Sequence, residues 1–181
     1  FEHDGQLTKR DQRASALARL APRPGGLLWD VGAGAGSVAI EWLRAHPTTA
    51  AIAVEHHPER AARIARNAAR FGVPRLRLVT GRAPDALVDL PAPDAIFIGG
   101  GATAPGLLDR CRAALPPGGR LVVHGVTFET EELLLAAFRT HGGELTRLSV
   151  EHAAPLGGRF HGWQPARAVT QWSWIKSGDR R

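Results

Sequence analysis

The sequence predicts an α/β domain with a mostly parallel sheet and helices on both of its faces. Short apolar runs of strand length alternate with amphipathic segments of helix length as far as about residue 141. The apolar run Leu27–Val31 also leads directly into a glycine-rich turn at residues 32–36, and a helical segment follows. A strand, a glycine turn and a helix in this order are typical of nucleotide-like ligand binding in α/β folds.

The expected elements follow one another along the whole chain. Strands are expected at residues 27–31, 50–55, 76–80, 94–98 and 120–124, with helices at 37–46, 58–71, 105–115 and 129–141. An earlier helix follows Thr8-Lys9-Arg10-Asp11, which has the form of a capping box. Residues 145–153 and 168–176 are expected to pair as an antiparallel hairpin around a loop at 155–165, because no helical segment separates them. The sheet would then have seven strands.

The glycine turn narrows the choice of ligand. Gly32, Gly34 and Gly36 stand at alternate positions, where the missing Cβ atoms let the backbone turn tightly and approach a ligand. A dinucleotide fingerprint needs its third glycine where this chain has Ser37, so a dehydrogenase is disfavoured. The pattern Asp30-x-Gly32-x-Gly34-x-Gly36 instead resembles the first motif of class I S-adenosylmethionine-dependent methyltransferases. That resemblance implies a Rossmann-like fold, with the turn around the methionine part of the cofactor and Asp30 beside its cationic end.

A second ligand-type feature ends the next expected strand. Glu55 stands roughly twenty residues beyond the turn, where a carboxylate can accept both ribose hydroxyls of an adenosine. Dehydrogenases use an acid at this place too. Glu55 therefore indicates nucleoside binding without choosing between cofactors.

Composition limits the class of protein. The 181 residues suit one domain, and the hydrophobic share of 44% fits a soluble globular protein. We expect a cytoplasmic protein with no membrane partner, because no apolar run approaches a membrane span and the first residues are polar. The single cysteine, Cys111, excludes an intrachain disulfide and falls on the apolar face of its helix.

The net charge of +6 makes an anionic partner plausible. Four arginines lie on one side of the helix at 58–71, whose other side is apolar, and we interpret this stripe as an ordinary solvated surface. The stripe consists of Arg60, Arg63, Arg66 and Arg70.

Four segments together carry a closer resemblance. They are Leu7-Thr8-Lys9, the strand and turn at 28–37, the Ile-Gly-Gly-Gly strand end at 94–101, and Leu-Pro-Pro-Gly-Gly-Arg at 115–120. In this order they resemble the decarboxylating precorrin C15-methyltransferases of corrin biosynthesis (the CbiT family), which also occur as C-terminal halves of fused C5,15-methyltransferases. The resemblance extends to about residue 130. Because the chain starts at Phe1 and contains no methionine, we expect residues 1–181 to be one domain from the C-terminal part of a fused protein.

The resemblance implies transfer of a methyl group from S-adenosylmethionine to C15 of a precorrin, with decarboxylation of the C12 acetate. It also implies a set of cofactor contacts. The expected cofactor-binding residues are Thr8, Gly32, Ala33, Gly34, Ala35, Gly36, Glu55, His56, Gly81, Arg82, Ala83 and Gly99. The acceptor would be an anionic tetrapyrrole, the assembly a homo-oligomer, specifically a tetramer, and a C5-methyltransferase domain a fused or cooperating partner.

Three residues are candidates for work on the substrate. Ligands of open α/β sheets bind at the carboxyl ends of the strands, which places His124 and the loop at 155–165 near the acceptor. Arg159 and His161 of that loop can bind a carboxylate or move a proton, or can be ordinary exposed loop residues. His124 can equally be a strand-end residue with a local hydrogen bond. The pair His56-His57 lacks the spacing of a zinc site, so no metal is expected.

Other functions and roles stay open. The basic charge allows an RNA methyltransferase, although aromatic residues make up only 6% and no Asn-Pro-Pro-Tyr-like motif is present. A methyltransferase-like module that serves only as a scaffold is a further alternative. We expect no nucleic-acid partner. Trp172 and Trp174 share one strand face, which packs on the helices or, together with Trp163, serves assembly.

Overall fold

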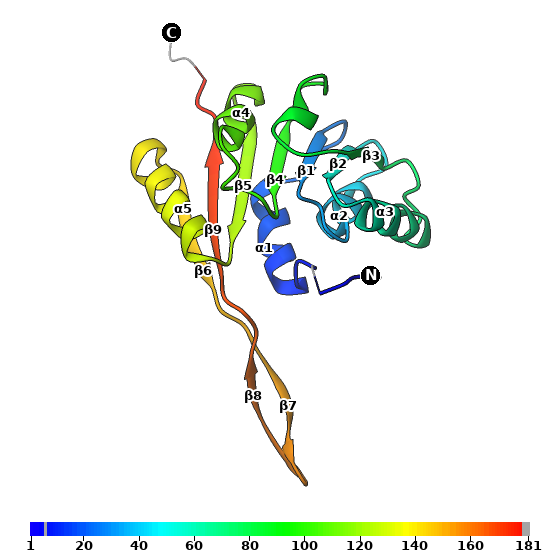
Figure 1. Cartoon of the computed structure of the whole chain (residues 1–181), viewed down its shortest axis with the longest axis vertical. Coiled ribbons are helices and arrows are strands. Elements are labelled where there is room, and N and C mark those ends of the chain that lie inside the picture. The colour runs from blue at the N-terminus through cyan, green and yellow to red at the C-terminus, as the bar shows by residue number, and fades with distance from the viewer. Residues whose placement is uncertain (6, 179–181) are drawn as a thin grey trace.

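The computed structural model describes residues 1–5 and 7–178. Its main sheet contains seven strands in the order β3-β2-β1-β4-β5-β9-β6 (Figure 1). Only β9 runs antiparallel to its neighbours, β5 and β6, so the predicted mostly parallel, seven-stranded sheet is confirmed. The strands are β1 (Leu27–Val31), β2 (Ala50–Glu55), β3 (Arg77–Thr80), β4 (Ala95–Ile98), β5 (Arg120–Gly125), β6 (Glu144–Leu148) and β9 (Val169–Ile175).

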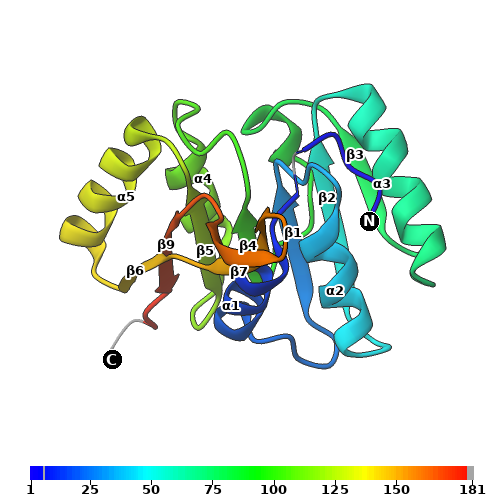
Figure 2. The same cartoon turned by 90° about the horizontal axis from the view of Figure 1, so that it is seen from below.

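Helices cover both faces of the sheet, as predicted (Figure 2). One face carries α1 (Arg10–Leu20), α2 (Ser37–Ala45) and α3 (Pro58–Arg70); the other carries α4 (Leu107–Ala114), α5 (Phe128–His141) and the short η1 (Asp85–Leu87). Alternate residues of β1 enter the two cores, since Leu28 packs with the first group and Trp29 with the second. Cys111 is fully buried in the second core, and burial raises the pKa of its thiol to about 12.

Two further strands form a separate ribbon. β7 (Glu151–Gly157) pairs with β8 (Phe160–Pro165), and Figure 1 shows this ribbon projecting from the sheet edge at which β9 begins. The predicted strand at 145–153 therefore ends early, at Leu148, and most of the predicted loop at 155–165 is β-structure. Nearly all ribbon side chains are exposed. Beyond Leu148, no helix of the described part of the chain covers these segments, and they pair with each other outside the core.

The two tryptophans of β9 pack on the helices. Trp172 is fully buried in the second core, and its indole Nε1 donates a hydrogen bond to the Gly142 carbonyl at 2.9 Å. Trp174 stacks on it with ring centroids 6.4 Å apart and lies under the Arg112 guanidinium. Trp163, on the ribbon, is 73% exposed. Of the two roles left open for the β9 face, the structure thus selects packing.

The predicted capping box at residues 8–11 does not form. Helix α1 begins at Arg10 with Lys9 as its N-cap, and no side chain caps it. The Arg13 guanidinium takes over this anchoring, because Nη1 donates to the Thr8 carbonyl and Nε donates to Glu41 Oε1 of α2 at 2.6 Å. A long side chain from within the helix therefore fixes the residue before it.

No helix in the described part of the chain is long and apolar enough to cross a membrane.

Candidate active site

Two cavities lie side by side where the parallel strands end. The first, of about 380 Å³, lies beyond the ends of β1, β2 and β4 and next to the segment that follows β3. It is lined by eight of the twelve predicted cofactor-binding residues. These are Gly32, Gly34, Glu55, His56, Gly81, Arg82, Ala83 and Gly99.

The second cavity, of about 460 Å³, lies between the start of α1 and the ends of β4 and β5. Thr8 and Ala33 of the predicted cofactor set line it, as does His124 of the predicted catalytic set. Gly32, Gly34 and Gly99 line both cavities. The glycine turn and the end of β4 therefore form the border that the two cavities share.

The backbone is closely packed at this shared border. Gly32 has a φ of +67°, and a Cβ at this position would lie 2.5 Å from the Gly100 carbonyl oxygen. Gly36 has a φ of +74°, and its Cβ would lie 2.8 Å from Ile64 of α3. Gly36 and Ala35, both predicted to touch the cofactor, line neither cavity. Gly36 instead allows α3 to pack against the turn.

Glu55 holds the turn as well as facing the first cavity. The side chain is only 3% exposed, and Oε2 accepts a hydrogen bond from the Gly34 amide at 3.0 Å. Oε1 accepts one from the His57 amide at 3.0 Å and lies 3.3 Å from His56 Nδ1. The carboxylate is thus oriented by backbone donors on both sides, and each oxygen keeps a lone pair for a ligand.

Asp30 lies beneath the turn and lines neither cavity, and its place beside the cationic end of the cofactor stays a prediction. Its Oδ2 accepts the Ala39 amide in the first turns of α2 at 3.0 Å. Burial raises the pKa of this carboxyl to about 7; the Ala39 hydrogen bond opposes the rise and the Glu55 charge adds to it. The residue stabilises the start of α2 because β1 directs its side chain toward that face.

His124 is a buried, uncharged imidazole on the wall of the second cavity. Its side chain is 8% exposed, Nε2 lies 2.9 Å from Gln171 Oε1, and the Phe97 ring meets it edge to face at 4.9 Å. Burial lowers its pKa to about 4, with a smaller opposing effect of the Gln171 hydrogen bond. His124 is therefore available as a neutral donor or acceptor at pH 7.

The ribbon residues Arg159 and His161 line neither cavity of this chain. Both are exposed, and the Arg159 guanidinium lies over the ring of Phe160. The arginine that does reach the second cavity is Arg167, at the base of the ribbon. Sequence reasoning missed it because the predicted loop ended at residue 165. The signal available was its position immediately before the last strand.

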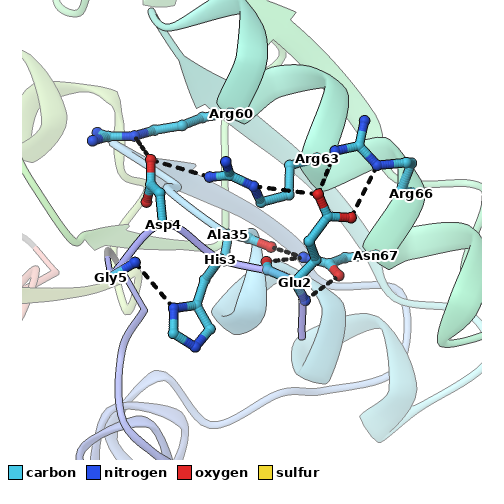
Figure 3. A network of polar contacts seen from close by, with 9 residues as sticks. All are labelled: Glu2, His3, Asp4, Gly5, Ala35, Arg60, Arg63, Arg66 and Asn67. Carbon is cyan, nitrogen blue, oxygen red and sulfur yellow. Dashed lines mark hydrogen bonds and ion pairs between the residues drawn. The ribbon is translucent and has the colours of Figure 1, made fainter.

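The N-terminal segment is tied to the glycine turn by one side chain (Figure 3). Asn67 of α3 is 1% exposed. It accepts the Glu2 amide at 2.9 Å and donates to the Glu2 carbonyl at 2.9 Å and to the Ala35 carbonyl at 3.0 Å. Residues far apart in sequence are thus joined within one turn of α3.

The arginine stripe of α3 holds the same segment. Arg60 and Arg63 contact Asp4 at 2.9 and 3.1 Å, and Arg66 Nε donates to Glu2 at 3.0 Å (Figure 3). These three arginines of the stripe interpreted as an ordinary solvated surface therefore also anchor the N-terminal segment through surface ion pairs. Because Arg60 also lines the first cavity, the segment lies at the cavity rim.

Among the described residues there is no group of three His, Cys, Asp or Glu side chains that could hold a metal ion.

Comparison with known proteins identifies a matching family. The family model described as the precorrin methyltransferase domain matches residues 1–176. A Sinorhizobium protein named precorrin-6Y C(5,15)-methyltransferase [decarboxylating] is 56% identical over 176 residues, which cover 97% of this chain and 42% of that protein. The chain therefore spans less than half the length of this relative.

Two other relatives match over most of their own length. The crystal structure of the C-terminal domain of precorrin-6Y C5,15-methyltransferase from Rhodobacter capsulatus superposes with a TM-score of 0.89 at 47% identity, covering 97% of this chain and 94% of that one. A Salmonella typhimurium protein named cobalt-precorrin-6B C(15)-methyltransferase (decarboxylating) is 33% identical over 155 residues, covering 83% of this chain and 80% of that protein.

Replacing Asn67 with Ala should lower the free energy of unfolding by about 1–3 kcal/mol, because the Ala35 carbonyl loses its side-chain donor in a buried place. Urea unfolding measures this, and hydrogen exchange of the Glu2 amide should become faster. Arg70→Ala, at the exposed end of the same helix, is the control and should change stability by less than about 0.5 kcal/mol. Equal stabilities for the two variants would contradict the role of Asn67.

The His124 imidazole should titrate with a pKa of about 4, below its ordinary 6.5. Since the unfolded chain then binds more protons between these values, this residue's contribution to stability is complete above pH 6.5 and is lost as the pH falls toward 4. NMR titration of the ring measures the pKa. Gln171→Leu should lower it further, because the Gln171 hydrogen bond raises it. Titration near 6.5 would show that the ring is not buried as described.

Proposed function

The chain belongs to the precorrin methyltransferase family, and we propose that it transfers a methyl group from S-adenosylmethionine to C15 of a precorrin and promotes decarboxylation of the C12 acetate. The chain matches 80% of a relative whose name contains only the C15 reaction and 42% of one whose name contains both C5 and C15. The shared part therefore corresponds to C15 methylation with decarboxylation. It leaves C5 methylation to a separate domain.

The observation that carries this proposal is the pair of cavities separated by the glycine turn. Methyl transfer requires donor and acceptor to meet in line at short distance, and it requires less acid or base catalysis than alignment. Gly32, Gly34 and Gly99 line both cavities, so the two cavities adjoin along these glycines and molecules bound in them can meet there. A side chain at any of these places would hold them apart.

The residues of the first cavity fit S-adenosylmethionine, which would supply the methyl group. Glu55 offers carboxylate oxygens to the ribose hydroxyls, and its orientation is already set by the Gly34 and His57 amides. Ala83 leaves room and free backbone groups beside an adenine edge. Thr8 and Ala33, which line the second cavity instead, would approach the cofactor from the acceptor side.

The acceptor then occupies the second cavity. There His124, kept uncharged by burial, can donate or accept a hydrogen bond with the acceptor. When the C12 acetate loses carbon dioxide, the electron pair of the broken C–C bond stays on the macrocycle side. The ring system can delocalise this pair until a proton is added to the remaining carbon. No lysine is then needed to form a Schiff base with the substrate.

The test is turnover of a purified precorrin-6 substrate, followed by carbon dioxide release and product mass, with bulk RNA as the competing acceptor. Calorimetry should show binding of S-adenosylhomocysteine tighter than binding of NAD. Glu55→Gln should weaken that binding by about 1.5–3 kcal/mol, roughly 10- to 150-fold, because one charged acceptor is lost. Glu59→Gln, on the exposed side of α3, is the matched control. Methylation of RNA without turnover of the precorrin would replace the proposal with an RNA methyltransferase.

We also propose that the chain forms a homo-oligomer and that the ribbon mediates it. The family resemblance implies that this oligomer is a tetramer. A lone two-stranded ribbon is marginally stable in water, and both of its edges have unpaired backbone groups. Its side chains Leu156, Phe160 and Trp163 are 76%, 64% and 73% exposed. A second copy of the chain would cover these side chains and pair the free edges.

Light scattering at micromolar concentration should therefore give a mass above that of the single chain. The double variant Phe160→Glu with Trp163→Glu should shift the mass to that of a monomer, because charges would have to be buried. Phe128→Glu, at an even more exposed apolar position on α5, is the control. A monomeric unmodified chain would refute the assembly.

A further inference from the structure

We propose that Lys9 and Arg167 bind carboxylate groups of the methyl acceptor at the mouth of the second cavity. The inference rests on the proposed function in one respect, that the acceptor occupies this cavity. It assigns the recognition of a polycarboxylate to the base of the ribbon and the start of α1. The tip of the ribbon, with Arg159, has no part in it within one chain.

The charges of the two cavities differ. The first combines the Glu55 carboxylate with Arg60 and Arg82. Among its described lining residues the second contains two cations, Lys9 and Arg167, and neither Asp nor Glu. His124, the other titratable group that lines it, is uncharged at neutral pH. A cationic sulfonium donor is disfavoured in such a cavity, and an anionic acceptor is favoured.

Neither cation takes part in a polar contact between the residues that the structure describes. In the part of the chain that the structure describes, no hydrogen bond or ion pair involves the side chain of Lys9 or Arg167, and both are exposed. Neighbouring arginines differ, since Arg10 pairs with Asp11 at 3.3 Å and Arg13 pairs with Glu41 at 2.6 Å. Two unpaired cations at a cavity mouth remain available to an incoming anion.

The two cations are held on one platform although they come from opposite ends of the chain. The Lys9 carbonyl accepts the Arg13 amide at 2.8 Å, which makes Lys9 part of the first turn of α1. Gln12 of the same turn is 6% exposed, and its Nε2 donates to the Arg167 carbonyl at 3.0 Å. This buried side chain fixes the backbone of Arg167 to the helix that carries Lys9.

The chemistry of the two side chains suits this role. The Arg167 guanidinium can form two parallel hydrogen bonds with one carboxylate, and the Lys9 ammonium acts as a point charge for another. Both act at the mouth, on groups remote from the reacting carbon. Their loss should therefore raise KM much more than it lowers kcat.

The experiment compares Lys9→Glu, Arg167→Glu and the double variant with the unmodified chain in the precorrin assay. Each single reversal should raise KM at least tenfold, and kcat should change by less than threefold. Calorimetric affinity for S-adenosylhomocysteine should stay within twofold, which also shows that the variants fold. The KM of Arg167→Lys should lie between those of the unmodified chain and Arg167→Glu, because the charge stays and the paired hydrogen bonds are lost. Arg139→Glu, an exposed α5 residue, makes the same change in net charge and should leave KM unchanged.

Binding of uroporphyrin, a polycarboxylate porphyrin, by fluorescence titration separates this inference from the proposed reaction. If the unmodified chain turns over the precorrin and the reversals leave KM within twofold, the carboxylate site is refuted and the reaction stands. If the unmodified chain does not turn over the precorrin but binds uroporphyrin in a way that Lys9→Glu and Arg167→Glu abolish, the site stands and the reaction is refuted. If the reversals leave KM unchanged and the unmodified chain does not bind uroporphyrin, the site is refuted outright.

Discussion

The arrangement depends on the absence of side-chain atoms in the glycine turn. A Cβ on Gly32 would overlap the backbone after β4, and one on Gly36 would overlap Ile64 of α3. Because neither is present, β1, β4 and α3 converge on the turn, and Glu55 can reach across to hold its Gly34 amide. The two cavities, and the short path between them, are consequences of this close approach.

Sequence reasoning was most successful where structure depends on local pattern. Apolar runs located the strands of the main sheet, and glycine spacing with Glu55 located the first cavity. These signals are short-range, since a buried parallel strand must be apolar and a turn with positive φ favours glycine. The predicted capping box was wrong because a motif of four residues does not include Arg13, whose side chain contacts Thr8 and Glu41.

The features that could not be predicted depend on contacts between distant segments. Asn67 was one polar residue in an otherwise ordinary helix until Glu2 and Ala35 were placed beside it. Arg167 acquires a place in the second cavity only through Gln12. Arg159 was preferred to it because its glycine neighbours suggested a loop over the strand ends, whereas the pairing of β7 with β8 directs that segment outward. The pattern likewise did not specify which sheet face receives the Asp30 side chain, whose Oδ2 accepts the Ala39 amide of α2.

The position of β9 has a consequence for synthesis of the chain. The last strand lies between β5 and β6, so this half of the sheet stays open until residues 169–175 leave the ribosome. The residues that line the first cavity all precede residue 108. The second cavity needs Arg167 and Val169. During translation, all residues of the first cavity are therefore synthesised well before the last residues of the second.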